Sequence, residues 1–189
     1  MSKTFYTSDT HFGHENIIRY SGRPFSSVEE MNSTMIENWN SLVGPDDTVW
    51  HLGDVVMNVK WLHSVSQLNG QKILVAGNHD HCWAGFKKPK ATVHDYIDAG
   101  FQYVITNGIL IHTLKNNREV VLSHLPYEGN QHDGRKFEGW RPRDTGLVNL
   151  CGHVHEAWKI QGRSINVGVD QWDFKPVAEE TLVDLIATL

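Results

Sequence analysis

Thr48-Val49-Trp50-His51-Leu52-Gly53-Asp54 is the stretch on which the fold of this chain depends. Its first four residues favour a β-strand, so Asp54 stands where that strand gives way to a loop. Gly53 lets the backbone come close, which makes Asp54 well placed to bridge two metal ions. Taken alone, however, Gly-Asp after a strand is usually an ordinary turn. The rest of the chain decides between these two interpretations.

The composition indicates a single globular domain over residues 1–189. A chain of 189 residues with 40% apolar content can bury one substantial core. The net charge of -5 and the sequence pI near 6.2 argue against a protein that coats long nucleic acids, but not against a small nucleotide substrate. The 12 histidines exceed what a core needs, and they favour metal binding or acid–base chemistry.

Neither cysteine chemistry nor membrane insertion is expected. Cys82 and Cys151 lie far apart and form no Cys-x-x-Cys pair, which argues against a zinc site built from thiolates. No apolar run is long enough for a signal peptide or for a membrane span. We therefore expect a cytoplasmic protein, in the host cytoplasm if a phage encodes it.

The first half of the chain is predicted to alternate strands and helices. Strands are expected at 4–8, 48–51 and 72–76, and helices at 15–20, 28–42 and about 59–68. Each strand ends in polar residues, namely Asp9 and His11, then Asp54, then Gly77-Asn78-His79-Asp80. In an extended chain Asp9 and His11 point to the same side. Ligands gather at the carboxyl ends of strands in an open α/β sheet, so the three endings can form one site.

The second half is predicted to be rich in hairpins. Strands at 103–106 and 108–113 surround the turn signal Asn107-Gly108, and a strand at 118–123 ends at His124. A strand at 147–151 leads into Gly152-His153-Val154-His155, whose histidines both face inward if the segment is extended. A strand at 164–169 and a helix at 177–188 close the chain. Residues 126–146 are expected to form a long surface loop, either solvated or in contact with substrate.

Several polar residues allow two interpretations. Asn78 offers a neutral oxygen that a metal ion accepts, and Asp80 could orient His79 as a proton donor. The alternative is an Asn turn with a solvated His-Asp pair. His14 either contacts substrate or caps the helix that follows it.

Oxygen and nitrogen donors follow most of the predicted strands. The candidate metal ligands are Asp9, His11, Asp54, Asn78, His124, His153 and His155. This set contains no thiolate and exceeds the needs of one tetrahedral zinc ion. It suits two ions of the manganese, iron or zinc type that share a carboxylate. The ordered set therefore favours Asp54 as a bridge.

In these residues the sequence resembles the calcineurin-like metallophosphoesterases. Five ordered blocks match, namely Asp9-x-His11, Gly53-Asp54, Gly77-Asn78-His79-Asp80, His124 and Gly152-His153-x-His155. The opening Asp9-Thr10-His11-Phe12-Gly13-His14 also resembles a compact subgroup from bacteria and their phages. The resemblance implies an α/β (α+β) fold, a four-layer sandwich of two mixed β-sheets flanked by helices.

The resemblance also implies how the ligands are shared. One ion would be held by Asp9, His11, Asp54 and His155, and the other by Asp54, Asn78, His124 and His153. A bridging hydroxide would attack phosphorus, while His79, steadied by Asp80, would stabilise the transition state or protonate the leaving oxygen. Manganese is the expected metal, with iron or zinc as alternatives.

The expected activity is hydrolysis of phosphodiester bonds in small nucleotides or cyclic nucleotides, 2',3'-cyclic forms included. A protonating His79 suits an alkoxide leaving group, and His14, Trp140 and Arg143 are candidate substrate contacts. No basic track for a long polymer is evident. The alternatives are a phosphomonoesterase or nucleotide pyrophosphatase of the same fold, or a non-catalytic interaction module. Oligomeric state stays open.

Overall fold

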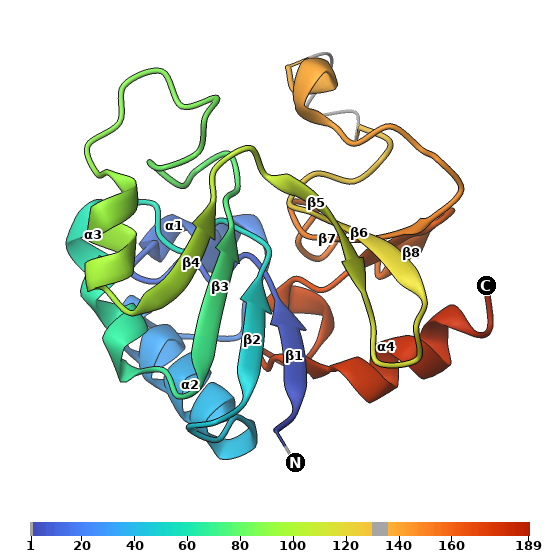
Figure 1. The fold of residues 1–189 in the computed structure, drawn as a ribbon. Coiled ribbons are helices and arrows are strands. Elements are labelled where there is room, and N and C mark those ends of the chain that lie inside the picture. Colours follow the sequence, from blue (N-terminus) through green and yellow to red (C-terminus); the bar gives the residue numbers. More distant parts are fainter. Residues whose placement is uncertain (1, 130–135) are drawn as a thin grey trace.

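Two five-stranded sheets form the centre of the molecule (Figure 1). The computed structural model describes residues 2–129 and 136–189. The strand order is β10-β1-β2-β3-β4 in the first sheet and β5-β6-β7-β9-β8 in the second. Each sheet contains both parallel and antiparallel pairs. The predicted fold class, two mixed sheets with helices, is confirmed.

The first sheet collects the polar strand endings of the N-terminal half at one edge. Its strands are β1 (Thr4–Thr7), β2 (Thr48–His51), β3 (Gln71–Val75), β4 (Phe101–Ile105) and β10 (Val177–Ala178). The connections contain α1 (Glu15–Tyr20), α2 (Val28–Leu42), the 3-10 helix η1 (Val59–Gln67) and α3 (Val93–Asp98). Strands β1 to β4 are parallel, so their carboxyl ends point the same way, upward in Figure 1. The loops after β1, β2 and β3 therefore meet.

The second sheet brings the histidines of the C-terminal half to the same region. It comprises β5 (Ile109–Thr113), β6 (Glu119–Ser123), β7 (Val148–Cys151), β8 (Ile160–Gln161) and β9 (Ser164–Asn166). The 3-10 helices η2 (Glu138–Trp140) and η3 (Val169–Gln171) lie in its connections, and α4 (Glu179–Ile186) ends the chain. His124 directly follows β6, and His153 and His155 follow β7.

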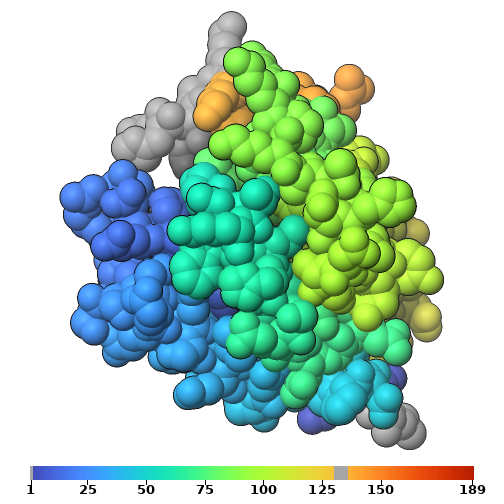
Figure 2. Space-filling model, turned by 90° about the vertical axis from the view of Figure 1, so that its left-hand side faces the viewer, coloured from blue at the N-terminus to red at the C-terminus, as the bar shows by residue number. Residues whose placement is uncertain are grey.

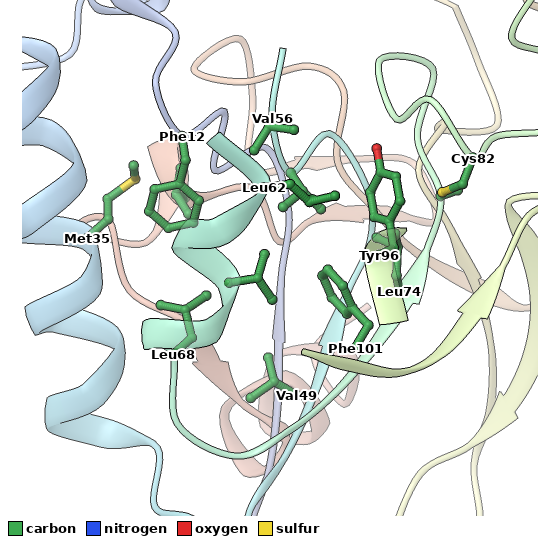
Figure 3. Packing of buried hydrophobic residues seen from close by; sticks show 14 of the residues in the cluster. Phe12, Met35, Val49, Val56, Leu62, Leu68, Leu74, Cys82, Tyr96 and Phe101 are labelled. Carbon is green, nitrogen blue, oxygen red and sulfur yellow. The ribbon is translucent and has the colours of Figure 1, made fainter. Parts of the chain in front are cut away.

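Two buried clusters hold these layers together. The first lies between the first sheet and its helices, and it includes the predicted stripe Met31, Met35 and Trp39 of α2. Figure 3 shows Met35 of this cluster with Phe12 and Leu68. The second joins the two sheets, because Tyr6 of β1 packs in one cluster with Leu150 of β7. The first sheet is thus covered on both faces, and its polar residues are confined to strand ends. No helix among the described residues is long and apolar enough to cross a membrane.

The helix predicted at about 59–68 is present, but the hairpin predicted around Asn107-Gly108 is wrong. Val59, Leu62 and Val65 recur at steps of three, and the segment Val59–Gln67 forms a 3-10 helix, which has three residues per turn. The strands around Asn107-Gly108 form no hairpin with each other. Instead β4 pairs with β3, and the chain passes through Gly108 (φ +71°) into the second sheet. Long-range pairing has overridden the local turn signal.

The chain ends also differ from expectation. The predicted strand at 164–169 stops at Asn166, and a 3-10 turn follows. The first two residues of the predicted helix at 177–188 form β10, which pairs with β1, and the helix itself begins at Glu179. Helix α3 was not predicted, although the Asp95 carboxylate accepts a hydrogen bond from the backbone N–H of Thr92 in a capping box. Of the predicted loop 126–146, residues 130–135 lie outside the described residues.

Candidate metal centre

Acidic and imidazole side chains from both sheets meet at the shared edge. Two groups of side chains offer ligand atoms that all lie within 4.8 Å of one another. They are Asp9, His11 and His155, and Asp9, Asp54 and His124. Asp54 Oδ2 lies 3.5 Å from His11 Nε2 and 3.3 Å from His124 Nε2, so this carboxylate is between the two sheets. Asp9 belongs to both groups, whereas the sequence analysis expected it in one.

The backbone of five predicted ligands is left-handed. Positive φ angles occur at Asp9 (58°), His11 (47°), Asp54 (58°), His153 (73°) and His155 (46°). The expectation that the Asp9/His11 and His153/His155 pairs converge from extended chain is therefore wrong. Such backbone angles are uncommon outside glycine and persist only where the surroundings enforce them, often at functional sites.

Backbone hydrogen bonds enforce the two turns of the first sheet. The Asp9 N–H donates to the Gly53 carbonyl at 3.0 Å, and the His11 N–H donates to the Asp54 carbonyl at 3.1 Å. Gly53 has φ +92°, and a Cβ there would collide with the backbone of Gly77. The two strand endings are thereby tied to each other, which explains the need for glycine before Asp54.

Asp80 secures the loop that carries Asp54. Its buried carboxylate accepts hydrogen bonds from the N–H groups of Asp54 (2.8 Å), Val55 (3.1 Å) and Gly77 (2.8 Å). Burial and the charge of Asp54 raise the pKa of Asp80 to about 7, while these three bonds oppose the rise. The prediction that Asp80 steadies His79 is therefore corrected, because both carboxylate oxygens hold backbone instead.

His79 itself stands at the surface of the site. Its side chain is 40% exposed, and its Nε2 lies 4.0 Å from Asp54 Oδ2. The backbone N–H of His79 donates to Asp54 Oδ1 at 2.9 Å, which fixes the start of the side chain. The ring is thus held near Asp54 while its polar edge stays accessible.

Each histidine of the second sheet is oriented by another group. The ring Nδ1 of His124 donates to the Leu52 carbonyl at 2.8 Å, which turns Nε2 toward Asp54 and toward the Asn78 oxygen at 3.1 Å. Burial tends to lower the pKa of His124, but the charge of Asp54 and its hydrogen bond, together with the charge of Asp9 and the Leu52 carbonyl, raise that pKa to about 9. The backbone N–H of His153 donates to Asp9 Oδ2 at 2.9 Å, and its ring centroid lies 5.2 Å from that of His124.

A buried ion pair, which no sequence pattern predicted, lies behind His155. Asp170 Oδ2 lies 3.2 Å from His155 Nδ1, and the Arg23 guanidinium donates to both carboxylate oxygens of Asp170, at 2.8 and 2.9 Å. Arg23 also donates to the Asp9 carbonyl at 2.7 Å. A carboxylate that holds the far nitrogen of a histidine is typical of metal sites. Asp170 could have been noticed because it follows a strand, whereas nothing near Arg23 marked it.

The arrangement leaves polar atoms that a cation would satisfy. Among the described residues, buried side-chain atoms without a hydrogen-bond partner include Asp9 Oδ1, both ring nitrogens of His11 and Nδ1 of His14. Burial of an unsatisfied group costs ~1–3 kcal/mol. Asp9 Oδ1 lies 4.0 Å from both His11 Nε2 and His155 Nε2, so one ion could contact all three atoms. The mixed oxygen and nitrogen donors fit divalent manganese, iron or zinc.

The three candidate substrate contacts occupy different places. His14 lines a cleft of about 530 Å³ together with His11, His79, His153 and His155, and its side chain forms no helix-capping bond. Trp140 lines a second cavity, which begins at Asn78 and His79. Arg143 is exposed and lines neither of these two cavities.

Comparison with known proteins places the chain in a family. It is 33% identical over 202 residues to the Gene 66 protein of Mycobacterium phage L5, covering 98% of this chain and 95% of that one. It is 34% identical over 192 residues to an uncharacterized protein of Methanocaldococcus jannaschii, covering 98% and 92%. The chain belongs to the family of these phage and archaeal proteins. No family model matches it.

A solved structure shares the fold of this chain. A protein of unknown function from Aquifex aeolicus superposes with a TM-score of 0.72 at 26% identity, over 98% of this chain and all of that one. The likeness to a phosphopantetheinyl hydrolase from Mycobacterium tuberculosis is slight, with a TM-score of 0.33 and 19% identity over 77% of this chain and 54% of that one.

Proposed function

We propose that this chain is a metal-dependent phosphoesterase of the calcineurin-like type that hydrolyses phosphodiester bonds in small nucleotides. The observation that carries the proposal is the convergence of Asp9 Oδ1 and His11 Nε2, buried without hydrogen-bond partners among the described residues, with Asp54 where the two sheets meet. The five ordered sequence blocks that resemble those enzymes support the same assignment.

The ligands would divide between two sites that share Asp54. Asp9, His11, Asp54 and His155 would form one site, and Asp54, Asn78, His124 and His153 the other. The short distances from Asp54 to His11 and His124 support a bridging position for this carboxylate. Bound divalent ions would supply an activated water and would polarise the phosphate oxygens. Manganese is the first metal to test.

His79 is the group we assign to the leaving oxygen. Its Nε2 would donate a proton to the departing alkoxide. An alkoxide needs such a proton more than a good leaving group does. The hydrogen bond from its backbone to Asp54 keeps the ring close to the reacting phosphate. His14 lines the same cleft and would contact the phosphate from the opposite loop.

The test is an assay of manganese-loaded protein on three substrates. These are a nucleotide diester, a nucleotide monoester and a 2',3'-cyclic nucleotide, each with and without a chelator. We expect chelator-sensitive hydrolysis that is fastest on a diester or cyclic diester. A clear preference for the monoester would overturn the diester assignment. Binding of two manganese ions without hydrolysis of any phosphoester would instead favour a non-catalytic module.

A further inference from the structure

A second cavity opens beside the candidate metal centre. It has a volume of about 650 Å³ and shares Asn78 and His79 with the site described above. His79 also lines the cleft that holds the metal-facing histidines. His79 therefore lines two spaces, the cleft that contains His11, His153 and His155 and the cavity that contains Asn78. A molecule that places a phosphate in the cleft would extend past His79 into this cavity.

The walls of the cavity are aromatic. Trp83 follows the Asn78-His79 turn and Trp140 lies in η2, and their ring centroids are 4.7 Å apart with planes inclined at 56°. Phe137 packs edge-on to Trp83 at 6.2 Å, and Phe86 adds a fourth ring to the lining. Figure 2 shows green residues of the segment after β3 beside orange residues near position 140. Flat apolar walls of this kind suit a planar ring, which stacks on them.

The rim of the cavity is positively charged. Lys87, Lys88 and Lys136 line the cavity, and all three side chains are exposed. Among the described residues, no acidic side chain lines the cavity. This concentration of cations is unusual in a chain whose net charge is -5. Lysines bind phosphate as point charges, so the rim suits an anionic group.

We propose that this cavity binds the nucleobase and a second phosphate of the substrate, while the phosphate to be hydrolysed lies in the metal cleft. The inference rests on the proposed function and narrows its substrate class to nucleotides with a phosphate beyond the scissile one. The base stacks against Trp140 and Trp83, and the second phosphate contacts Lys87 and Lys88. A cyclic mononucleotide fills the aromatic part of the cavity but leaves the lysines without a partner.

Equilibrium binding tests the cavity without relying on turnover. Full-length protein is kept in chelator to prevent hydrolysis, and calorimetry measures the Kd for three probes. The probes are the dinucleotide pApA, adenosine 2',3'-cyclic phosphate and inorganic phosphate. We expect pApA to bind about tenfold more tightly than the cyclic nucleotide, and inorganic phosphate to bind most weakly. Equal binding of pApA and inorganic phosphate would overturn the proposal.

Variants separate the two parts of the cavity. Trp140→Ala should weaken both nucleotides by about tenfold, in line with the ~1–3 kcal/mol of base stacking, and Trp140→Phe should restore most of the affinity. The double variant Lys87→Ala/Lys88→Ala should weaken pApA about tenfold and leave the cyclic nucleotide within about twofold. The matched control is Lys115→Ala, since Lys115 lies in the β5–β6 turn at the far end of the second sheet.

Two results would contradict the proposal, and each is distinct from failure of the proposed function. Unchanged pApA affinity in folded Trp140→Ala would show that the cavity does not bind the base. Unchanged pApA affinity in the lysine variant would show that Lys87 and Lys88 do not bind the second phosphate. Thermal unfolding of every variant shows whether it is folded. If pApA binds as expected but manganese-loaded protein hydrolyses no diester, the cavity stands and the proposed function falls. If a diester is hydrolysed but neither Trp140→Ala nor the lysine variant changes pApA affinity, the proposed function stands and the cavity proposal falls.

Discussion

The candidate metal centre and the aromatic cavity meet at His79 but are built in different ways. The seven candidate ligands of the centre follow β1, β2, β3, β6 and β7 within a few residues; four of them are buried and five take left-handed backbone angles. The cavity is lined by segments that connect strands, and its lysines are exposed. Two sheets thus fix the reactive groups, whereas connecting segments surround what we propose is the rest of the substrate. With this arrangement, changes in the connecting segments can alter which substrate binds without disturbing the reactive groups.

The largest effect is expected from removing the shared carboxylate. Asp54→Asn should abolish hydrolysis and weaken both metals together, because Asp54 Oδ2 lies 3.5 Å from His11 Nε2 and 3.3 Å from His124 Nε2. Metal content per chain and diester turnover are the measurements. Asp46→Asn, in an exposed turn just before β2, is the matched control. Retention of both ions by folded Asp54→Asn would contradict the bridging role.

The next largest effect is expected at the boundary between the two regions. His79→Ala should lower kcat for a diester by about 10²–10⁴-fold, the usual contribution of a general acid. Metal content should stay at the wild-type level, since the sequence resemblance does not make His79 a ligand. His94→Ala on the exposed face of α3 is the control. An unchanged kcat would show that another group protonates the leaving oxygen.

Loss of the carboxylate behind His155 should have a smaller effect. Asp170→Asn keeps the shape of the side chain but removes the charge that faces both His155 and Arg23. We expect a loss of about 10–100-fold in affinity for one of the two metals, as is usual for partners of metal-binding histidines. Calorimetric titration with manganese would resolve the two sites. Equal weakening of both sites would place Asp170 in a general structural role.

The last effect is a gradual dependence of metal affinity on pH, which is no larger than about tenfold over any one pH unit. In metal-free protein the pKa of His124 is raised to about 9. Its stabilising contribution is therefore complete below the unfolded value near 6.5 and is lost as pH rises through about 9. A metal must displace this proton, so manganese affinity should increase about tenfold per pH unit between those limits. Titrations at several pH values test this, and an affinity independent of pH would contradict the protonated state.

The strands that lead into the candidate ligands and the identity of the converging residues could be predicted, but the way they converge could not. Strand endings at Asp9, Asp54 and Asn78 are visible because polar residues interrupt β-favouring runs. The left-handed turns at Asp9 and His11 depend on hydrogen bonds to the distant Gly53 and Asp54 carbonyls, which no local pattern encodes. For the same reason the turn signal at Asn107-Gly108 did not predict that β4 and β5 belong to different sheets.

Partners of the ligands were harder still to predict. Asp80 looked like the orienting group of its neighbour His79, yet it binds three backbone N–H groups around Asp54. Asp170 and Arg23 are separated by 147 positions and form a pair only because η3 returns to the first sheet. Trp83 gave no signal because an aromatic residue after a turn is usually core, and only its contact with Trp140 identifies the cavity.

The number and coupling of bound manganese ions test the central claim most directly. Protein freed of metal is loaded with Mn²⁺ at pH 8, the bound ions per chain are counted, and their electron paramagnetic resonance spectrum is recorded. We expect two ions per chain with the spectrum of a magnetically coupled pair, and loss of that coupling in Asp54→Asn. One ion per chain, none, or two ions without coupling would contradict it.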